Sequence, residues 1–251
     1  MSNAMIFAAG LGTRLRPLTD TMPKAMVPVG GRPLLQILIE RLVAAGITDI
    51  VVNVHHFAQQ IIDFLDDSPF SRSLSGVRIQ VSDESDMLLE TGGGLKRAAR
   101  LFADKSPILV HNVDILSDLD LRSFYSSVVQ RQGSPTTLIV SQRNTQRYLL
   151  ADSDSRLVGW TNIATGEVKS PYPDLDVQSC TKVAFSGIHV FNPALLPYME
   201  KWEGKFSLID FYLSICDCQP IYLQQQSDLH LIDVGKLDTL AVAEQFLQNQ
   251  N

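Results

Sequence analysis

The segment Ala8–Thr19, AAGLGTRLRPLT, ends the short apolar run Met5–Ala9 and continues into a glycine-rich loop. The apolar run has the composition of a buried parallel strand. Gly10 and Gly12 carry no side chain, so backbone N–H groups in the loop can approach phosphate oxygens closely. Arg14 adds a planar, permanently charged guanidinium that suits a phosphate. The segment therefore predicts an α/β fold with an anion-binding loop after its first strand.

The surroundings of this loop are basic, although the chain as a whole is acidic. The 251 residues are 45% hydrophobic and 19% charged, a balance that excludes disordered and collagen-like proteins. The formal net charge of −6 disfavours a nucleic-acid partner. Between Met5 and Ile39, however, Asp20 is the one acidic residue, and the basic residues are Arg14, Arg16, Lys24 and Arg32. A small anionic ligand is therefore expected.

Cysteine usage and hydropathy indicate a cytoplasmic protein without a membrane partner. Cys180, Cys216 and Cys218 form no C-x-x-C or zinc spacing, which predicts reduced thiols. No apolar stretch reaches the roughly 20 residues that span a membrane, and no signal peptide is expected. Residues 1–4, before a second methionine, resemble an expression-tag remnant and are set aside from the fold.

The first 140 residues alternate between strand and helix patterns. Strands are expected at Met5–Ala9, Asp49–Val54, Val77–Val81, Pro107–Asn112 and Thr136–Ser141. Helices are expected at Pro33–Ala45, Ala58–Leu65, Gly92–Phe102 (capped by Thr91) and Leu121–Gln132. This alternation predicts a doubly wound, mostly parallel, Rossmann-like sheet with helices on both faces. Ligands bind such sheets at the carboxyl ends of the strands, so the loops after Ala9, Val54, Val81 and Asn112 should share one rim.

After about residue 143 the pattern changes to a small antiparallel region. The expected strands are Tyr148–Asp152, Leu157–Trp160, Val183–Phe191 and Ile221–Gln225. The expected helices are Pro193–Met199, Ser207–Cys216 and Lys236–Gln248. No composition break marks a linker, so residues 5–251 are expected to form one domain.

Three competing explanations of the glycine-rich segment fit less well. A Walker loop needs Gly-Lys-Ser/Thr. Lys205 and Lys236 each follow a glycine, but the next residues are Phe206 and Leu237. A dinucleotide fingerprint needs a third glycine where Leu15 stands, which disfavours a Rossmann-type dehydrogenase. A plain strand-to-helix turn would explain the glycines but not the following Thr-Arg-x-x-Pro.

The pattern GxGTRxxPxT at Gly10–Thr19, followed by PKAMVPV at Pro23–Val29, resembles the signature of sugar-1-phosphate nucleotidyltransferases. The resemblance continues, in the family's order, through Gly31–Leu34 (GRPL), Leu89–Gly94 (LETGGG), Asp114, Phe185–Ile188 (FSGI) and Asp233–Gly235 (DVG). The LETGGG and DVGxL segments are most similar to N-acetylmuramate-1-phosphate uridylyltransferases, and mannose-1-phosphate guanylyltransferases come next.

The resemblance implies attack of a sugar-1-phosphate oxygen on the α-phosphorus of a nucleoside triphosphate, with Mg²⁺ as cofactor. UTP is favoured and GTP comes next; the products are pyrophosphate and a nucleotide-sugar for cell-wall or polysaccharide synthesis. A phosphate monoester has a second pKa of about 6, so the nucleophile is already ionised at neutral pH. No general base is needed, and the enzyme's tasks are alignment and charge neutralisation.

The resemblance also implies a role for each site residue. The catalytic residues would be Arg14, Lys24 and Asp114, and the Mg²⁺ ligands would be Asp114 and Asp233. The nucleotide-binding residues would be Ala8, Ala9, Gly10, Leu11, Gly12, Thr13, Glu90, Thr91 and Gly92. The sugar-binding residues would be Asn112, Gly187 and Lys182. Residues 5–143 would then bind the nucleotide, and residues 144–251 would bind the sugar and complete the metal site.

This sequence departs from the family pattern at two places. Val113 stands before Asp114 where the family usually has glycine. The Glu-Lys-Pro motif is absent, its region reading VGWTN at Val158–Asn162; Lys182 could replace that lysine or be a surface lysine. A rival hypothesis is a non-catalytic nucleotide-sugar-binding or regulatory homologue. The four charged residues of the expected centre argue against it, and the base, the sugar and the oligomeric state stay open.

Overall fold

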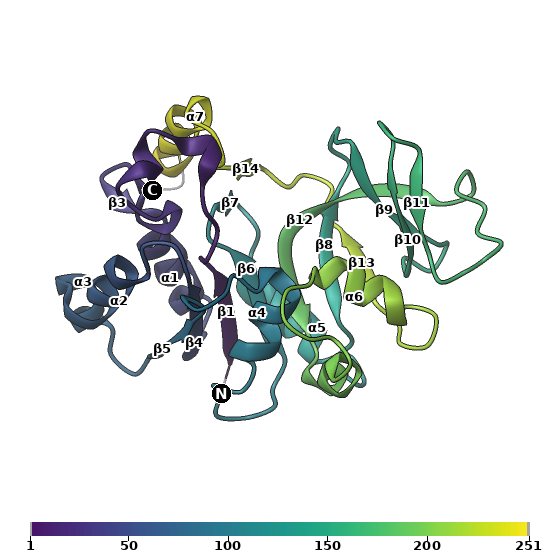
Figure 1. The fold of residues 1–251 in the computed structure, drawn as a ribbon, viewed down its shortest axis with the longest axis horizontal. Helices are drawn as coiled ribbons and strands as arrows, with labels where there is room; N and C mark the ends of the chain where they lie inside the picture. The colour runs from purple at the N-terminus through teal and green to yellow at the C-terminus, as the bar shows by residue number, and fades with distance from the viewer. Residues whose placement is uncertain (1, 250–251) are drawn as a thin grey trace.

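Four parallel strands form one side of a large sheet in the computed structural model, which describes residues 2–249 (Figure 1). Strand β1 (Asn3–Phe7) lies between β4 (Asp49–Val54) and β6 (Ile108–Asn112), and β5 (Arg78–Asp83) pairs with β4. Every residue of β4 is buried, as expected for a strand that is covered on both faces.

The sheet continues beyond β6 with mostly antiparallel strands. The long strand β12 (Thr181–Phe191) pairs antiparallel with β6 and also with β8 and β9. These further strands are β8 (Thr137–Ser141), β9 (Arg147–Ala151), β10 (Leu157–Asn162), β11 (Glu167–Lys169) and β13 (Tyr222–Gln225). The prediction that β13 is antiparallel is wrong, because it pairs in parallel with β8. Side-chain alternation reveals which residues are buried, but not the direction of the partner strand.

Helices cover both faces of the sheet and produce two hydrophobic cores. One core contains residues of α1 (Leu34–Ala44), α2 (Ala58–Asp67), α5 (Leu121–Val129) and α7 (Asp238–Gln248). The other contains residues of α4 (Glu90–Ala98), the 3-10 helix η4 (Pro193–Met199) and α6 (Leu208–Ile215). Leu109 and Val110, neighbours on β6, belong to opposite cores. The expected α/β fold with helices on both faces is therefore confirmed.

The remaining elements are short and lie mainly near the rim of the sheet. They are η1 (Thr13–Leu15), η2 (Leu18–Asp20), η3 (Lys24–Met26), β2 (Pro28–Val29), β3 (Arg32–Pro33), α3 (Pro69–Ser73), β7 (Ile115–Ser117) and β14 (Leu231–Asp233). Near the end of the chain, β14 returns to pair antiparallel with β7 (Figure 1). This pairing brings the segment around Asp233 back to the loop after β6.

Two local predictions need correction. Setting aside residues 1–4 is wrong for Asn3 and Ala4, which are fully buried and belong to β1; Met1 lies outside the described residues. Thr91 does not cap a helix, because α4 begins at Glu90 without a side-chain cap. The Thr91 hydroxyl instead accepts a hydrogen bond from the backbone N–H of Leu208 at 3.0 Å. Among residues 2–249, we find no helix with the length and apolar character needed to cross a membrane.

Two histidines are buried in the sheet, and burial lowers both pKa values. The pKa falls to about 4 for His111, where Arg41 adds repulsion, and to about 3 for His189. Both ring nitrogens of His189 lack a hydrogen-bond partner within the described chain, and its neighbours include the rings of Phe185 and Tyr212. Both imidazoles are therefore neutral in the folded protein at neutral pH.

Stability should consequently decrease in mild acid. As the pH falls below about 6.5, the histidines of the unfolded chain become protonated, whereas folded His111 and His189 stay neutral. Stability is therefore complete above pH 6.5 and declines as the pH falls toward the folded values. We expect the two histidines to lower the free energy of unfolding by about 3 kcal/mol between pH 6.5 and about pH 5. Urea titrations at several pH values measure this, and His189→Leu should halve the histidine contribution.

Candidate active site

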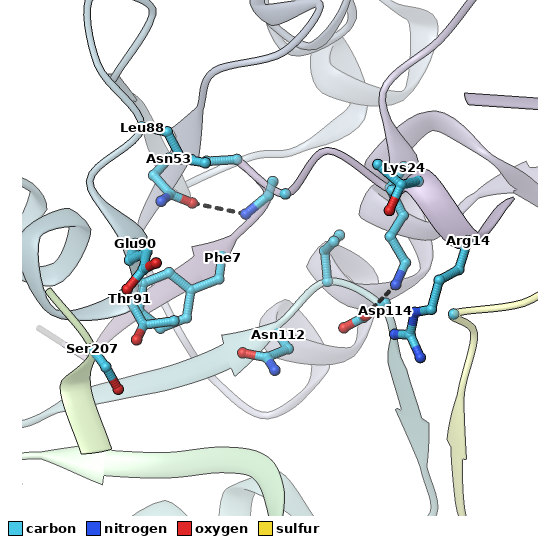
Figure 2. Close-up of a pocket in the computed structure, with 17 residues that line it drawn as sticks. Phe7, Arg14, Lys24, Asn53, Leu88, Glu90, Thr91, Asn112, Asp114 and Ser207 are labelled. Atoms are coloured by element: carbon cyan, nitrogen blue, oxygen red, sulfur yellow. Dashed lines mark hydrogen bonds and ion pairs between the residues drawn. The ribbon is translucent and has the colours of Figure 1, made fainter. Parts of the chain in front are cut away.

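A cavity of about 420 Å³ lies beyond the carboxyl ends of the parallel strands (Figure 2). The loops after β1, β5 and β6 contribute to its wall, as predicted, whereas β4 contributes Asn53 from within the strand rather than a residue of the loop that follows it. The predicted site residues that line it are Ala8, Ala9, Gly10, Gly12, Thr13, Arg14, Lys24, Glu90, Thr91, Asn112 and Asp114. The cavity therefore gathers most of the predicted nucleotide-binding and catalytic residues.

The glycine-rich loop folds tightly back onto Thr19 and Lys24. Gly12 has a φ of +63°, and a Cβ there would lie 2.9 Å from Thr19 Cγ2 and 3.1 Å from Lys24 Cβ. The Thr19 hydroxyl donates a hydrogen bond to the carbonyl oxygen of Gly12 at 2.8 Å. Glycine is required at position 12 both for this backbone conformation and for the close approach. The tight loop brings Lys24 next to Gly12, and both residues line the cavity.

Lys24 and Asp114, 90 positions apart in the chain, form an ion pair on the cavity wall (Figure 2). The ammonium of Lys24 donates to Oδ2 of Asp114. The two side chains are 10% and 20% exposed, respectively, so the pair is largely shielded from water. At this degree of burial, electrostatic interactions are stronger than at the open surface.

The second carboxylate, Asp233, lies close to this pair. The backbone N–H of Val234 donates to the carbonyl oxygen of Asp114 at 2.8 Å, and β14 continues that contact along β7. Arg14 Nη2 lies 3.8 Å from Asp233 Oδ2. A Cβ on Gly235 would come within 2.6 Å of Asp233 Oδ1 and 2.7 Å of Arg14 Nη2. Arg14, Lys24 and Asp114 thus line one end of the cavity, and Asp233 lies next to Arg14 just behind that wall.

The carboxylates of this centre fit a magnesium ion. Oδ1 of Asp233 is buried and has no hydrogen-bond partner among residues 2–249. Mg²⁺ prefers one or two carboxylates and completes its shell with water and phosphate oxygens. The described part of the chain contains no group of three or more His, Cys, Asp and Glu residues that could hold a metal by themselves. A metal held here would therefore need further oxygens from a ligand.

The other end of the cavity is lined by Glu90 and Thr91, which belong with Gly92 to the first turn of α4 and are supported by residues 205–208. Glu90 has a φ of +58°, and its carboxylate lies 3.2 Å from the ammonium of Lys205. The N–H of Gly92 donates to the carbonyl oxygen of Phe206 at 2.9 Å. A Cβ on Gly92 would lie 2.3 Å from the Phe206 ring, so this glycine permits close packing rather than facing the cavity. A left-handed Glu90 is strained, and such strain is common at functional sites.

Five predicted site residues are not part of the cavity wall: Leu11, Gly92, Lys182, Gly187 and Asp233. The side chain of Leu11 is exposed, and Lys182 is exposed on β12 opposite Leu150. Gly187 has a φ of +75°, and a Cβ there would lie 2.9 Å from Nδ2 of Asn112. Gly187 therefore leaves room for the Asn112 side chain, and the binding roles of Leu11 and Lys182 stay predictions.

The cavity also contains residues to which the sequence analysis gave no role. These are Phe7, Asn53, Leu88, Val113, Ser207 and Gly235. Asn53 is near the end of β4, whose following loop was expected at the rim, so its position carried a usable signal. Ser207 had no such signal, because it reaches the cavity from the start of α6. Val113 is 4% exposed and packs in a hydrophobic core, which accommodates the departure from glycine.

Comparisons with known proteins agree with this arrangement. Residues 3–250 match the nucleotidyl transferase family. The chain is 33% identical over 218 residues to the N-acetylmuramate alpha-1-phosphate uridylyltransferase of Caulobacter vibrioides, which covers 83% of this chain and 82% of that protein. The enzyme of the same name from Neisseria meningitidis is 44% identical over 124 residues, covering 49% of this chain and 52% of that protein.

The fold recurs in solved structures of much lower sequence similarity. The UTP-bound UGPase from Acinetobacter baumannii superposes with a TM-score of 0.80 and 17% identity, covering 100% of this chain and 94% of that chain. At that identity the likeness concerns the fold alone. The family match, together with the Caulobacter relative aligned along most of both chains, confirms the resemblance seen in the motifs: this chain belongs to the nucleotidyl transferase family.

Proposed function

We propose that this protein transfers a nucleotidyl group from a nucleoside triphosphate to a sugar-1-phosphate in a Mg²⁺-dependent reaction. The Lys24–Asp114 pair and Arg14 on the cavity wall, with Asp233 beside Arg14, carry this proposal. Two polyanions must be held together in such a reaction, and this end offers both cations and metal-binding oxygens. Pure nucleotide binding would not require all four side chains.

The cavity suggests how this chain's residues would divide the work. The backbone of the Gly10–Thr13 loop would bind phosphate oxygens, and Arg14 and Lys24 would offset the charge that develops on the leaving pyrophosphate. Asp114 and Asp233 would hold Mg²⁺, which would supply a further positive charge to the reacting phosphates. The sugar phosphate is already ionised at neutral pH, so none of these groups needs to remove a proton.

The turn Glu90–Gly92 would hold the nucleoside, and Asn112 would face the sugar. UTP is the favoured nucleotide, and an N-acetylated amino-sugar 1-phosphate is the favoured acceptor. Two relatives named N-acetylmuramate alpha-1-phosphate uridylyltransferase support this choice. The position of Asn112 on the cavity wall, supported by Gly187, agrees with a sugar on that side.

A substrate panel tests the proposal. The protein is incubated with Mg²⁺, each of the common nucleoside triphosphates and a set of sugar-1-phosphates, and pyrophosphate release is measured. We expect the highest kcat/KM for UTP with an N-acetylated amino-sugar 1-phosphate. Higher kcat/KM values with GTP and the 1-phosphate of an uncharged, unmodified hexose would overturn the substrate assignment. No release from any pair, with UTP binding retained, would favour the regulatory homologue.

A further inference from the structure

Asn53 and Glu84 are two buried side chains that connect opposite ends of the cavity. They are 2% and 0% exposed. The side-chain Oδ1 of Asn53 accepts a hydrogen bond from the backbone N–H of Ala8 at 2.7 Å, a contact drawn as a dashed line in Figure 2. The Asn53 amide donates to Glu84 Oε1 at 2.8 Å, and the N–H of Leu89 donates to Glu84 Oε2 at 3.2 Å. Three hydrogen bonds thus lead from the loop after β1 to the residue before Glu90.

The surroundings hold this pair in one arrangement. The N–H of Glu84 donates to the carbonyl oxygen of Val54 at 2.8 Å, and the carbonyl of Glu84 lies 2.7 Å from Nδ1 of His55. Gly94 of α4 packs directly on the pair, since a Cβ there would lie 2.8 Å from Glu84 Oε1 and 3.0 Å from Asn53 Nδ2. Burial raises the pKa of Glu84, and its two hydrogen bonds oppose that shift. The connection is therefore rigid and closely packed.

We infer that Asn53 and Glu84 are positioning residues that set the spacing between the phosphate loop (Ala8–Thr13) and the nucleoside turn (Glu90–Gly92). The inference rests on the proposed function, in which one triphosphate contacts both segments. A ligand that bridges two subsites gains affinity only when their separation matches its length. The pair should therefore matter for the whole nucleotide and little for a ligand that occupies the phosphate loop alone.

An exchange of the two functional groups provides a matched set of variants. Asn53→Asp places two carboxylates face to face. In Glu84→Gln, the new NH₂ group faces a donor in either orientation, namely the NH₂ of Asn53 or the backbone N–H of Leu89. The double variant N53D/E84Q can form all three hydrogen bonds again. The new amide at position 84 donates to one carboxylate oxygen at position 53, and the other oxygen accepts from the N–H of Ala8. The amide oxygen at position 84 accepts from the N–H of Leu89. Its size and net charge equal those of the wild type.

Calorimetric titration with UTP and, separately, with pyrophosphate, both with Mg²⁺, tests the inference. We expect each single variant to bind UTP about tenfold or more weakly, because a lost hydrogen bond in this connection changes the separation that one UTP molecule must bridge. Pyrophosphate affinity should stay within about twofold, because the phosphate loop alone does not bridge two subsites. The double variant should recover wild-type UTP affinity, and thermal unfolding verifies that each variant is folded.

Each alternative outcome is distinct. Unchanged UTP binding in both single variants, or equal weakening of UTP and pyrophosphate, would overturn the inference. Where a single variant does not fold, the double variant decides: wild-type UTP affinity supports the inference, and weakened UTP binding by a folded double variant contradicts it. A wild-type protein that binds neither ligand would instead refute the proposed function and, with it, this inference.

Discussion

Asp114→Asn is expected to lower kcat for nucleotidyl transfer by about 10³-fold or more, the scale of losing one electrostatic contact to a transition state or a metal ligand. Asparagine has the size of aspartate but lacks the charge that pairs with Lys24 and would hold Mg²⁺. The fold should persist, because the Val234 contact uses the backbone carbonyl of Asp114 rather than its side chain. Pyrophosphate release at saturating substrate measures the change.

Two further variants make this prediction specific. Asp233→Asn should cause a loss of the same order, because its buried Oδ1 and its position beside Arg14 assign it to the same centre. Asp154→Asn, on an exposed turn, is the matched control and should leave kcat unchanged. Rates near the wild-type value in either Asp114→Asn or Asp233→Asn would remove that residue from the metal assignment.

Lys24→Met is expected to lower kcat by about 10²- to 10³-fold, the range found when one charge-stabilising donor is removed. Methionine preserves the length and the apolar stem but removes the ammonium that contacts Asp114. Because both side chains are largely buried, the unpaired carboxylate should also cost about 1–3 kcal/mol of stability. Pyrophosphate release and urea unfolding measure the two effects separately.

A double variant separates catalysis from stability at this pair. Lys24→Met combined with Asp114→Asn removes both charges, so stability should return toward that of the wild type while turnover remains low. Lys201→Met, at an exposed lysine, serves as the control and should change neither quantity. A Lys24→Met protein that retains more than about a tenth of wild-type turnover would contradict the charge-stabilising role assigned here.

The sequence predicted much of the parallel half of the sheet because its signals there are local. The consecutive apolar residues Ile50, Val51 and Val52 identify a strand that is buried on both faces, and the structure places β4 at Asp49–Val54. The glycine-rich segment after the first strand was predicted to lie at a ligand site, and the structure places Gly10, Gly12, Thr13 and Arg14 on the cavity wall. Arg14, Lys24 and Asp114 lie together as the motif order implied.

The features that the sequence missed depend on contacts between distant segments. Nothing local shows that β13 lies beside β8 in parallel, or that Ser207 reaches the cavity from α6. The same holds for Asn53 and Glu84, whose contacts appear only when the sheet brings together the carboxyl ends of β1, β4 and β5. Short polar segments carry little periodicity, so their partners emerge from packing.

The most direct test of the central claim is the product balance of the wild-type protein. With UTP, an N-acetylated amino-sugar 1-phosphate and Mg²⁺, the account predicts equal amounts of pyrophosphate and nucleotide-sugar, measured by phosphorus NMR or chromatography. The reaction should stop when EDTA removes the metal and resume when Mg²⁺ is restored. UTP binding without formation of either product, with every sugar phosphate offered, would contradict the account.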